Sequence, residues 1–302
     1  MTQKNIATEN TRMAELLESL GTREGFSQTG LEGVQIIKNT RTHPRHPAVY
    51  NPSVVIVAQG QKKGYLGDKV YTYDADNYLT LSVLLPFECE IVRASEEQPF
   101  LALSIGVDLA VLSELMLELG EPADGCKTVC GASSCPLTPE LRSAAVRLLE
   151  CLQDREDCRI LGRQVVREII YRVLQGEHGA ALRALTGMHG SFGQIARALQ
   201  RIHTEYQTPL DVETLARTAN MSVSVFHQHF KTVTSTSPIQ YIKSIRLHKA
   251  RMLMAQEGFN AKSAAGEVGY SSPSQFSREF KRVFGKSPAE EANRMRHIGF
   301  SE

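Results

Sequence analysis

Residues 222–238 and 272–288 are two copies of one pattern, 50 positions apart. The first copy reads SVSVFHQHFKTVTSTSP and the second reads SPSQFSREFKRVFGKSP, with eight identities in seventeen positions. Each copy opens on a serine that can cap a helix, places phenylalanines at i and i+4 on one face, and ends at Ser-Pro. Each copy is therefore predicted to be an amphipathic helix with a polar outer face.

A short helical pattern and a turn precede each copy. These patterns cover 211–219 and 261–268, and the turns are Asn220-Met221 and Gly269-Tyr270. Two short helices joined by a tight turn form the helix-turn-helix arrangement that places a recognition helix in the DNA major groove. One such hairpin is more often only a packed helical pair, but a second copy at a fixed offset favours DNA binding.

The segment between the copies predicts a connecting helix over 239–254, started by Ser237-Pro238. At ~1.5 Å per residue this helix is ~24 Å long, so with its flanking turns it can hold two recognition helices about one DNA turn, ~34 Å, apart. We interpret it as a spacer. Its basic residues are Lys243, Arg246, Lys249 and Arg251.

Residues 209–288 resemble the DNA-binding domain of AraC-family bacterial transcriptional regulators. The resemblance rests on LARTANMSVSVFHQHFK, SPIQYIKSIRLHKARMLM and GYSSPSQFSREFKRVFGKSP. It implies base-reading positions in both recognition helices, of which Arg278 is the strongest because arginine can donate two hydrogen bonds to guanine. The implied base-reading residues are Ser224, His227, Gln228, Ser274, Gln275 and Arg278, and the implied phosphate contacts are Ser222, Lys231, Ser272, Lys281 and Arg282.

Several positions depart from that family pattern. On the first helix of the second unit, Ala261 and Ala264 stand where the family usually has bulky aliphatic residues, and Gly266 lies in mid-helix, where glycine costs ~1 kcal/mol relative to alanine. This helix is therefore predicted to pack loosely. The pair at 291–292 is Glu-Ala where the family usually has Tyr-Arg, which predicts a weaker grip on DNA. Ser235 replaces the glycine that normally ends the first recognition helix, a minor cost if the cap is left-handed.

The charge of the chain is divided unevenly. Residues 191–302 carry 15 Lys and Arg against 9 Asp and Glu, whereas residues 1–190 carry 19 against 24, so the total of +1 hides a basic C-terminal third. This modest positive charge attracts phosphate without making the domain a general nucleic-acid binder. Specificity is expected to come from base contacts.

The length of 302 residues and the 42% hydrophobic content allow two folded domains. The first twenty residues lack an apolar signal-peptide core, and no apolar run approaches the ~20 residues that span a bilayer. The chain is therefore expected to be cytoplasmic, with no membrane partner. In that compartment its six cysteines are expected to be thiols rather than disulfides.

The N-terminal half changes its periodicity near residue 108. Short strand patterns run over 53–59, 69–73, 78–84, 87–93 and 100–105, with a glycine-containing turn region between 60 and 67. After 108 the pattern predicts three or so helices and a loop at 122–138, and such helices often pair across subunits. The predicted fold class is α+β, with a helical segment at 1–25, a small sensor barrel at 26–107, a helical dimerisation segment at 108–188 and an all-α DNA-binding domain at 189–302.

This half resembles the cupin-like N-terminal domain of one branch of AraC-type regulators. The residues that carry the resemblance are NPSVVIVAQGQKKGYLGDKVYTYDADNYLTLSVLLPFECEI and QPFLALSIGVD. It implies a sensor domain. Cupin enzymes hold a metal through histidines inside the barrel, but no histidine lies between Val49 and Gly106, and His43 and His46 are predicted to be loop residues. We therefore expect no metal, no cofactor and no enzymatic activity.

Two candidate sensing sites remain open. Aromatic residues on the predicted strands supply apolar and hydrogen-bonding surfaces for an effector pocket, although such residues are more often core; the candidates are Tyr65, Tyr71, Tyr73, Tyr78 and Phe87. The alternative is a redox or electrophile switch through Cys126, Cys130 and Cys135, which share one Gly/Ser-rich loop. Their spacing is a weak zinc pattern because a fourth ligand is absent nearby.

The combined prediction is a transcriptional regulator that senses a small molecule and binds DNA. Its predicted partners are promoter DNA, RNA polymerase, an unknown small-molecule effector and a second copy in a homodimer. The rival interpretations are a cupin-type enzyme and a constitutive architectural DNA binder with a vestigial sensor.

Overall fold

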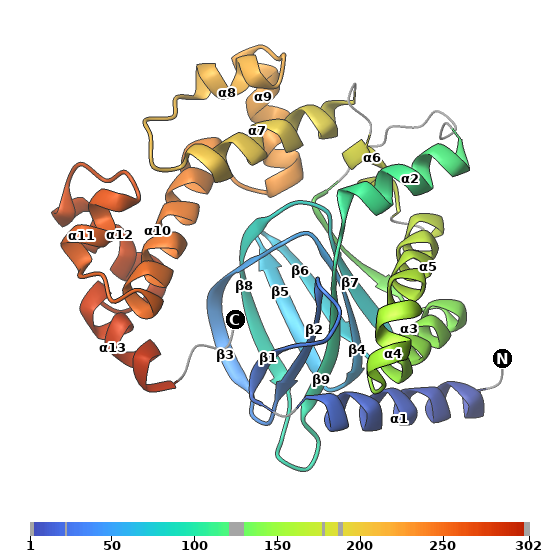
Figure 1. Ribbon diagram of the computed structural model, residues 1–302. Coiled ribbons are helices and arrows are strands. Elements are labelled where there is room, and N and C mark those ends of the chain that lie inside the picture. Colours follow the sequence, from blue (N-terminus) through green and yellow to red (C-terminus); the bar gives the residue numbers. More distant parts are fainter. Residues whose placement is uncertain (1–2, 22, 121–129, 177–178, 187–189, 299–302) are drawn as a thin grey trace.

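The computed structural model describes residues 3–21, 23–120, 130–176, 179–186 and 190–298 (Figure 1). A curled antiparallel sheet and its covering helices form the N-terminal part, and an all-helical part follows. This arrangement confirms the predicted α+β class. Within the described residues, no helix is both long and apolar enough to cross a membrane.

The described residues form a sheet of ten strands in the order β1-β2-β9-β4-β7-β6-β5-β8-β3, with β10 added beside β7. Strand β4 is buried on both faces, whereas β8 alternates, with Leu85, Phe87, Cys89 and Ile91 inside. The strands are β1 (Gly25–Gln28), β2 (Val34–Asn39), β3 (His43–Tyr50), β4 (Ser53–Gln59), β5 (Gln61–Leu66), β6 (Lys69–Asp74), β7 (Asn77–Leu81), β8 (Leu85–Arg93), β9 (Phe100–Gly106) and β10 (Ala132–Pro136).

Two parts of the strand prediction are wrong. The region between 60 and 67 was predicted as a turn but contains β5, where Gly64 lies so close to the Phe87 ring that a Cβ would collide with it. His43 and His46 were predicted in a loop but lie in β3, at one end of the sheet order. The prolines of β3 are tolerated there because an edge strand does not need every N–H for pairing.

Helices α1 to α6 pack against the sheet and one another. Met13 and Leu16 of α1 lie in one apolar cluster with Val54 and Ile56 of β4. Between residues 108 and 188 the described part holds five helices and β10, where three or so helices and a loop were predicted. The helices are α1 (Gln3–Leu20), α2 (Leu109–Leu119), α3 (Pro139–Cys151), α4 (Arg155–Ile160), α5 (Gly162–Gln175) and α6 (Ala180–Thr186).

The C-terminal part contains both predicted helix-turn-helix units. The first is α8 (Val212–Thr218) with α9 (Val223–Thr234), and the second is α11 (Ala261–Glu267) with α12 (Pro273–Phe284). The connecting helix α10 (Pro238–Gln256) has 19 residues, about 28 Å, and is longer than predicted. Helices α7 (Ser191–Glu205) and α13 (Pro288–Ile298) flank the two units.

One apolar cluster joins the sheet to the first unit. It runs from Val55 and Phe100 of the sheet to Phe226 and Phe230 of α9. The Tyr241 hydroxyl donates to the Leu84 carbonyl across this seam at 2.6 Å, and the Gly131 N–H donates to the Val233 carbonyl at 3.0 Å. The second unit has its own cluster around Phe276 and Phe280. The first unit and the sheet therefore share a core.

Candidate nucleic-acid interface

The local sequence explains how each recognition helix begins and ends. The Ser222 side chain accepts from the Val225 N–H, and the Ser272 side chain accepts from the Gln275 N–H, which confirms the predicted caps. Helix α9 ends at Ser235 with φ +56°, so the serine adopts the left-handed conformation that glycine usually supplies.

Both recognition helices bury their phenylalanines and expose the opposite face. Phe226, Phe230, Phe276 and Phe280 are fully buried. The outer faces are therefore open to a ligand of the size of DNA. All six predicted base-reading residues are exposed, namely Ser224, His227, Gln228, Ser274, Gln275 and Arg278, and the predicted phosphate contacts Ser222, Lys231, Lys281 and Arg282 are exposed while Ser272 is half-buried.

The two turns share one geometry with one difference. Asn220 and Gly269 adopt positive φ values of +52° and +83°. The N–H of the next residue then donates to a carbonyl five positions back, Met221 to Ala216 and Tyr270 to Ala265, each at 2.9 Å. Between the turn residue and the serine that caps the recognition helix, the second unit has one residue more than the first. The first helices of the two units are therefore 49 positions apart in the sequence, whereas the recognition helices are 50 positions apart.

The first helix of the second unit contributes small residues to the core of that unit, and its loose packing stays a prediction. Ala264 and Ala265 are fully buried in the cluster that contains Phe276 and Phe280. Gly266 instead faces open space, because a Cβ there would meet nothing within 4 Å.

Arg246 of α10 holds the two units against each other. Its guanidinium donates to three backbone carbonyls, those of Tyr206 at 2.7 Å, Thr208 at 2.8 Å and Gly269 at 3.1 Å. Burial lowers the pKa of Arg246. Tyr206 and Thr208 lie just before the first helix-turn-helix unit, and Gly269 lies in the turn of the second unit. The sequence carried no signal for this role beyond a basic residue on the connecting helix.

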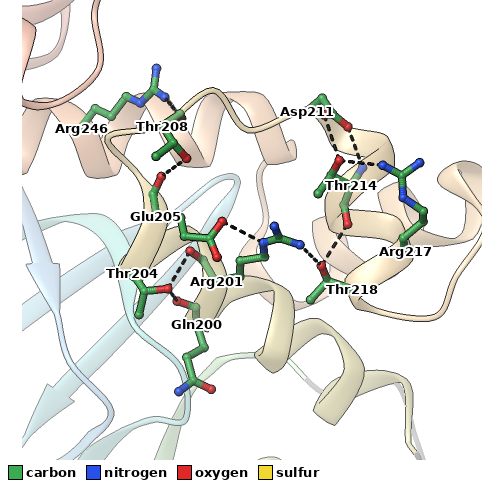
Figure 2. Close-up of polar contacts among 10 residues, drawn as sticks. All are labelled: Gln200, Arg201, Thr204, Glu205, Thr208, Asp211, Thr214, Arg217, Thr218 and Arg246. Carbon is green, nitrogen blue, oxygen red and sulfur yellow. Dashed lines mark hydrogen bonds and ion pairs between the residues drawn. The ribbon is translucent and has the colours of Figure 1, made fainter.

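A polar network ties α7 to the first helix of the first unit (Figure 2). Arg201 donates to the Glu205 carboxylate at 3.0 Å and to the Thr218 hydroxyl at 2.8 Å. Asp211 caps α8 by accepting from the Thr214 N–H at 2.6 Å and from its hydroxyl at 2.9 Å. The hydrogen bond from Arg201 to Thr218 joins α7 to α8, and the Asp211 cap fixes the start of α8.

Two polar residues of the second recognition helix, Gln275 and Glu279, already have partners within the protein. Gln275 donates to the Glu279 carboxylate at 3.1 Å, which also accepts from Lys243 and from Tyr270, each at 2.7 Å. Burial opposes ionisation of Glu279, but these hydrogen bonds lower its pKa. Arg278 has no hydrogen-bond or ion-pair partner among the described residues and is available to a ligand.

A groove of about 350 Å³ lies between the sheet and the DNA-binding part. On the sheet side Arg45 pairs with Glu88 and lies 4.1 Å from the centre of the Tyr65 ring. Arg282, a predicted phosphate contact, lines this groove and so faces toward the sheet. The main lining residues are Arg45, Tyr65, Phe87 and Glu88 of the sheet and Gln240, Lys243, Leu247 and Arg282 of the helices.

The structure does not place the predicted effector residues around one pocket. Tyr65 and Phe87 line the groove. Tyr73 and Tyr78 are buried in two different clusters, and the Tyr71 hydroxyl lies 3.3 Å from the Cys130 sulfur. Tyr73 and Tyr78 therefore lie inside the apolar clusters, and Tyr71 packs against one of them.

The predicted cysteine group is divided in the same way. Cys135 is buried beside Tyr78 in one cluster, whereas Cys130 contacts Tyr71, which packs against the other. Cys126 lies outside the described residues. Within the described residues, no group of three His, Cys, Asp or Glu side chains is placed to hold a metal ion.

The fold and the exposed recognition faces define a class, the DNA-binding transcriptional regulators. Residues 30–181 match the family described as AraC-type transcriptional regulator N-terminus, and residues 215–294 match a helix-turn-helix domain. The chain belongs to the AraC-type transcriptional regulators.

Individual curated relatives match about a third of this chain. HTH-type transcriptional regulator AlkR of Acinetobacter baylyi is 37% identical over 95 residues, 32% of this chain and 31% of that protein. RCS-specific HTH-type transcriptional activator RclR of Escherichia coli is 37% identical over 87 residues, 29% of this chain and 31% of that protein. The chain therefore spans about a third of the length of these curated relatives.

The whole fold has a solved counterpart. The crystal structure of unsaturated fatty acid bound ToxT from Vibrio cholerae superimposes with a TM-score of 0.57 over 90% of this chain and 97% of that chain, at 14% identity. At this identity the likeness concerns the fold.

Proposed function

We propose that the chain reads promoter DNA with both exposed recognition faces and adjusts its affinity when an effector binds the interdomain groove. The observation that carries this proposal is the pair of exposed polar faces, held by Arg246 on a shared support. The base-reading and phosphate roles of the residues named above are part of it, except that Arg282 lines the groove and is assigned to the effector site instead. Residues 26–188 would form the sensing and pairing part and 189–302 the DNA-binding domain. We place the protein in the cytoplasm, where it would act on RNA polymerase at the promoter.

Arg278→Ala and Lys281→Ala form a matched pair that tests the reading of DNA. We expect Arg278→Ala to cost ~1–3 kcal/mol on the preferred site and little on unrelated DNA, because a bidentate contact to guanine is lost. Lys281→Ala should weaken all sequences alike and reduce the salt dependence. Fluorescence anisotropy with DNA from upstream of the chain's own gene measures both. An unchanged ratio of specific to non-specific binding in Arg278→Ala would contradict the assignment.

The chemistry of the groove favours an apolar effector with a carboxylate. Tyr65, Phe87 and Leu247 offer apolar surface, and Arg282 offers positive charge, whereas Lys243 is already paired with Glu279. The fatty acid bound to ToxT supports the same class of ligand for this fold. The effector would contact the sheet and the DNA-binding part together, so its binding can favour one arrangement of the two.

Oleate tests this site, with oleyl alcohol as the neutral control. Oleate should change the DNA affinity of the full chain, and Arg282→Gln should weaken that effect several-fold while the alcohol has little effect, because the charged contact is missing in both cases. The measurement is an anisotropy titration on one DNA at several oleate concentrations. Equal effects of oleate and the alcohol on both proteins would argue against a carboxylate site in this groove.

A homodimer is supported by one surface feature. Leu117 of α2 is 84% exposed and Leu109 on the same helix is 57% exposed. Apolar side chains this exposed are typical of surfaces that another protein covers. We propose that α2 contributes to pairing of two copies. Sedimentation of Leu117→Glu beside the parent chain tests this, and an unchanged mass distribution would exclude α2 from the contact.

A further inference from the structure

A buried ammonium lies inside the curled sheet. Lys62 of β5 is 5% exposed, and its Nζ donates to the Tyr50 hydroxyl at 2.7 Å. The centres of the Tyr50 and Phe100 rings lie 5.3 Å and 5.9 Å from Nζ. Lys62 makes no ion pair with a carboxylate among the described residues. A buried positive charge without a counter-charge is costly, so a negative partner would stabilise it.

The neighbouring group that can supply a negative charge is the Cys89 thiol of β8, which is 1% exposed. Burial alone would raise the pKa of Cys89, but the Lys62 ammonium and hydrogen bonds from His46 and Tyr50 lower it to about 7. The Tyr73 hydroxyl is also buried and lies near Tyr50 and Cys89. The interior thus holds a cation, an ionisable thiol and a buried hydroxyl together.

His46 completes this arrangement from the neighbouring strand. It lies directly opposite Cys89 in the β3–β8 register, and its Nε2 is 3.3 Å from the Cys89 sulfur. Its Nδ1 is 2.9 Å from the Pro44 carbonyl, which orients the ring. The hydrogen bond with Cys89 raises the pKa of His46, so proton transfer from thiol to imidazole is favoured in both partners.

The other titratable groups of the neighbouring strands are engaged elsewhere or lie farther away. On β8 itself, Glu88 pairs with Arg45 and Glu90 accepts from the Tyr65 hydroxyl. The ring of His43 on β3 has its centre 6.3 Å from that of His46, and burial lowers the pKa of His43. The groups that set the charge at Cys89 are therefore Lys62, His46 and the hydroxyls of Tyr50 and Tyr73.

The edge of the sheet gives this thiol a route to solvent. His46 is an exposed residue in direct contact with the buried sulfur. Strand β3 ends the sheet order, contains Pro44 and Pro47, and its register with β8 shifts between His43 and His46. An edge strand with fewer pairing groups opens locally at lower cost than a central strand. Small molecules are therefore the reagents that can reach Cys89.

We propose that Cys89 is a modification site for hydrogen peroxide, with Lys62 as the counter-ion of the thiolate and His46 as the proton donor. The thiolate sulfur attacks one peroxide oxygen, so an S–O bond forms and the O–O bond breaks. Sulfur loses two electrons to the peroxide and becomes a sulfenic acid. The departing hydroxide takes the Nε2 proton of His46 and leaves as water.

The added oxygen has a direct mechanical consequence for the DNA-binding part. Strand β8 also carries Phe87 and Glu88 in the groove, and the Leu84 carbonyl beside its start accepts the Tyr241 hydrogen bond. Enlarging a side chain in a packed interior forces its neighbours to move. Oxidation of Cys89 therefore shifts the strand that holds the first unit, a consequence that rests on the proposed DNA-binding function.

Oxidation kinetics of the full chain test the site without any DNA. Hydrogen peroxide is added at several pH values, and sulfenic acid at each cysteine is trapped and measured by mass spectrometry. Cys151 is the internal control, since it is also buried and burial raises its pKa. Cys89 should react at least about ten-fold faster than Cys151 at a pH of about 6.5, because a thiolate is the reactive form and its fraction is larger at lower pKa.

Substitutions of Lys62 and His46 separate the roles of these two residues in the oxidation of Cys89. Lys62→Met keeps the length of the side chain and should shift the pH midpoint of Cys89 oxidation upward. His46→Gln keeps a hydrogen bond at an exposed position and should slow oxidation several-fold, because no proton donor remains. Equal rates at Cys89 and Cys151, or a midpoint that does not move in Lys62→Met, would overturn the proposal.

DNA affinity before and after peroxide tests the transmission. The unmodified chain should bind DNA, peroxide should change its affinity, and Cys89→Ser should bind normally and ignore peroxide. Rapid oxidation of Cys89 with unchanged affinity would overturn the transmission through β8. If the unmodified chain did not bind DNA, that result would count against the proposed function. The oxidation rate of Cys89 would still test the modification site independently.

Discussion

Gly269→Ala should destabilise the DNA-binding part by about 2–4 kcal/mol and strongly reduce DNA binding. Gly269 has φ +83°, and a Cβ there would collide with the Gln207 carbonyl, whose carbon would lie 2.9 Å away. These neighbouring atoms are backbone, so the contact is relieved only if the turn moves. That movement would also displace the Gly269 carbonyl from Arg246. Chemical denaturation of the full chain measures the loss.

Gly266→Ala is the matched control on the preceding helix. This glycine has open space around its Cβ position and lies in α11, so alanine should stabilise the protein by about 0.5–1 kcal/mol. Opposite signs for the two substitutions are the expected result. A Gly269→Ala protein as stable as the parent would refute the close approach of the turn to Gln207.

Glu291→Ala should destabilise the chain by about 3–5 kcal/mol, because a buried arginine would lose its counter-charge. The Glu291 side chain is 3% exposed and pairs with Arg251 at 2.9 Å and Arg294 at 2.7 Å. Arg251 also lies 5.1 Å from the centre of the Phe284 ring. These contacts join α10 to α13. Denaturation at neutral pH measures the effect.

The stabilisation that Glu291 and its arginine partners provide should depend on pH in one direction. Burial opposes ionisation of Glu291, but Arg294 and Arg251 outweigh it and lower its pKa. The stabilisation is therefore complete above the ordinary glutamate pKa and is lost as the pH falls through the folded value. The difference in stability between the parent and Glu291→Ala should narrow on acidification.

The double variant Arg251→Met with Glu291→Met provides the control. It removes both buried charges and should recover most of the stability, since Arg294 is 40% exposed and can turn to solvent. A double variant as unstable as Glu291→Ala would show that packing, rather than the ion pair, explains the loss. The Glu-Ala pair at 291–292 was predicted to weaken DNA binding, and the structure gives Glu291 a buried structural contact.

The helix-turn-helix units were predictable from the sequence because their signals are local. A capping serine, phenylalanines four residues apart and Ser-Pro act within one helix, and the repeat doubled the signal. The left-handed cap that Ser235 was expected to tolerate is present. Helical periodicity then predicted which face of each recognition helix is exposed.

The strand prediction failed at residues 60–67 and at His43 and His46, where the determining contacts are non-local. Gly64 signals a turn in the sequence, but in the sheet it makes room for Phe87. His46 and Cys89 are 43 positions apart and meet only through the β3–β8 register. Arg246 likewise contacts carbonyls whose positions depend on the fold of both units. No short-range pattern encodes these pairings.

The seam between the sheet and the first unit limits how this protein can exchange parts with its relatives. The Tyr241 hydroxyl accepts from the His203 ring within its own domain and donates to Leu84 in the other. A chimera that joins this C-terminal part to a foreign sensor would leave that hydroxyl and the Val233 carbonyl without their partners and expose the apolar surface around them. Such a chimera would keep these contacts only if residues 83–85 and 131 were transferred together with the helices that they contact.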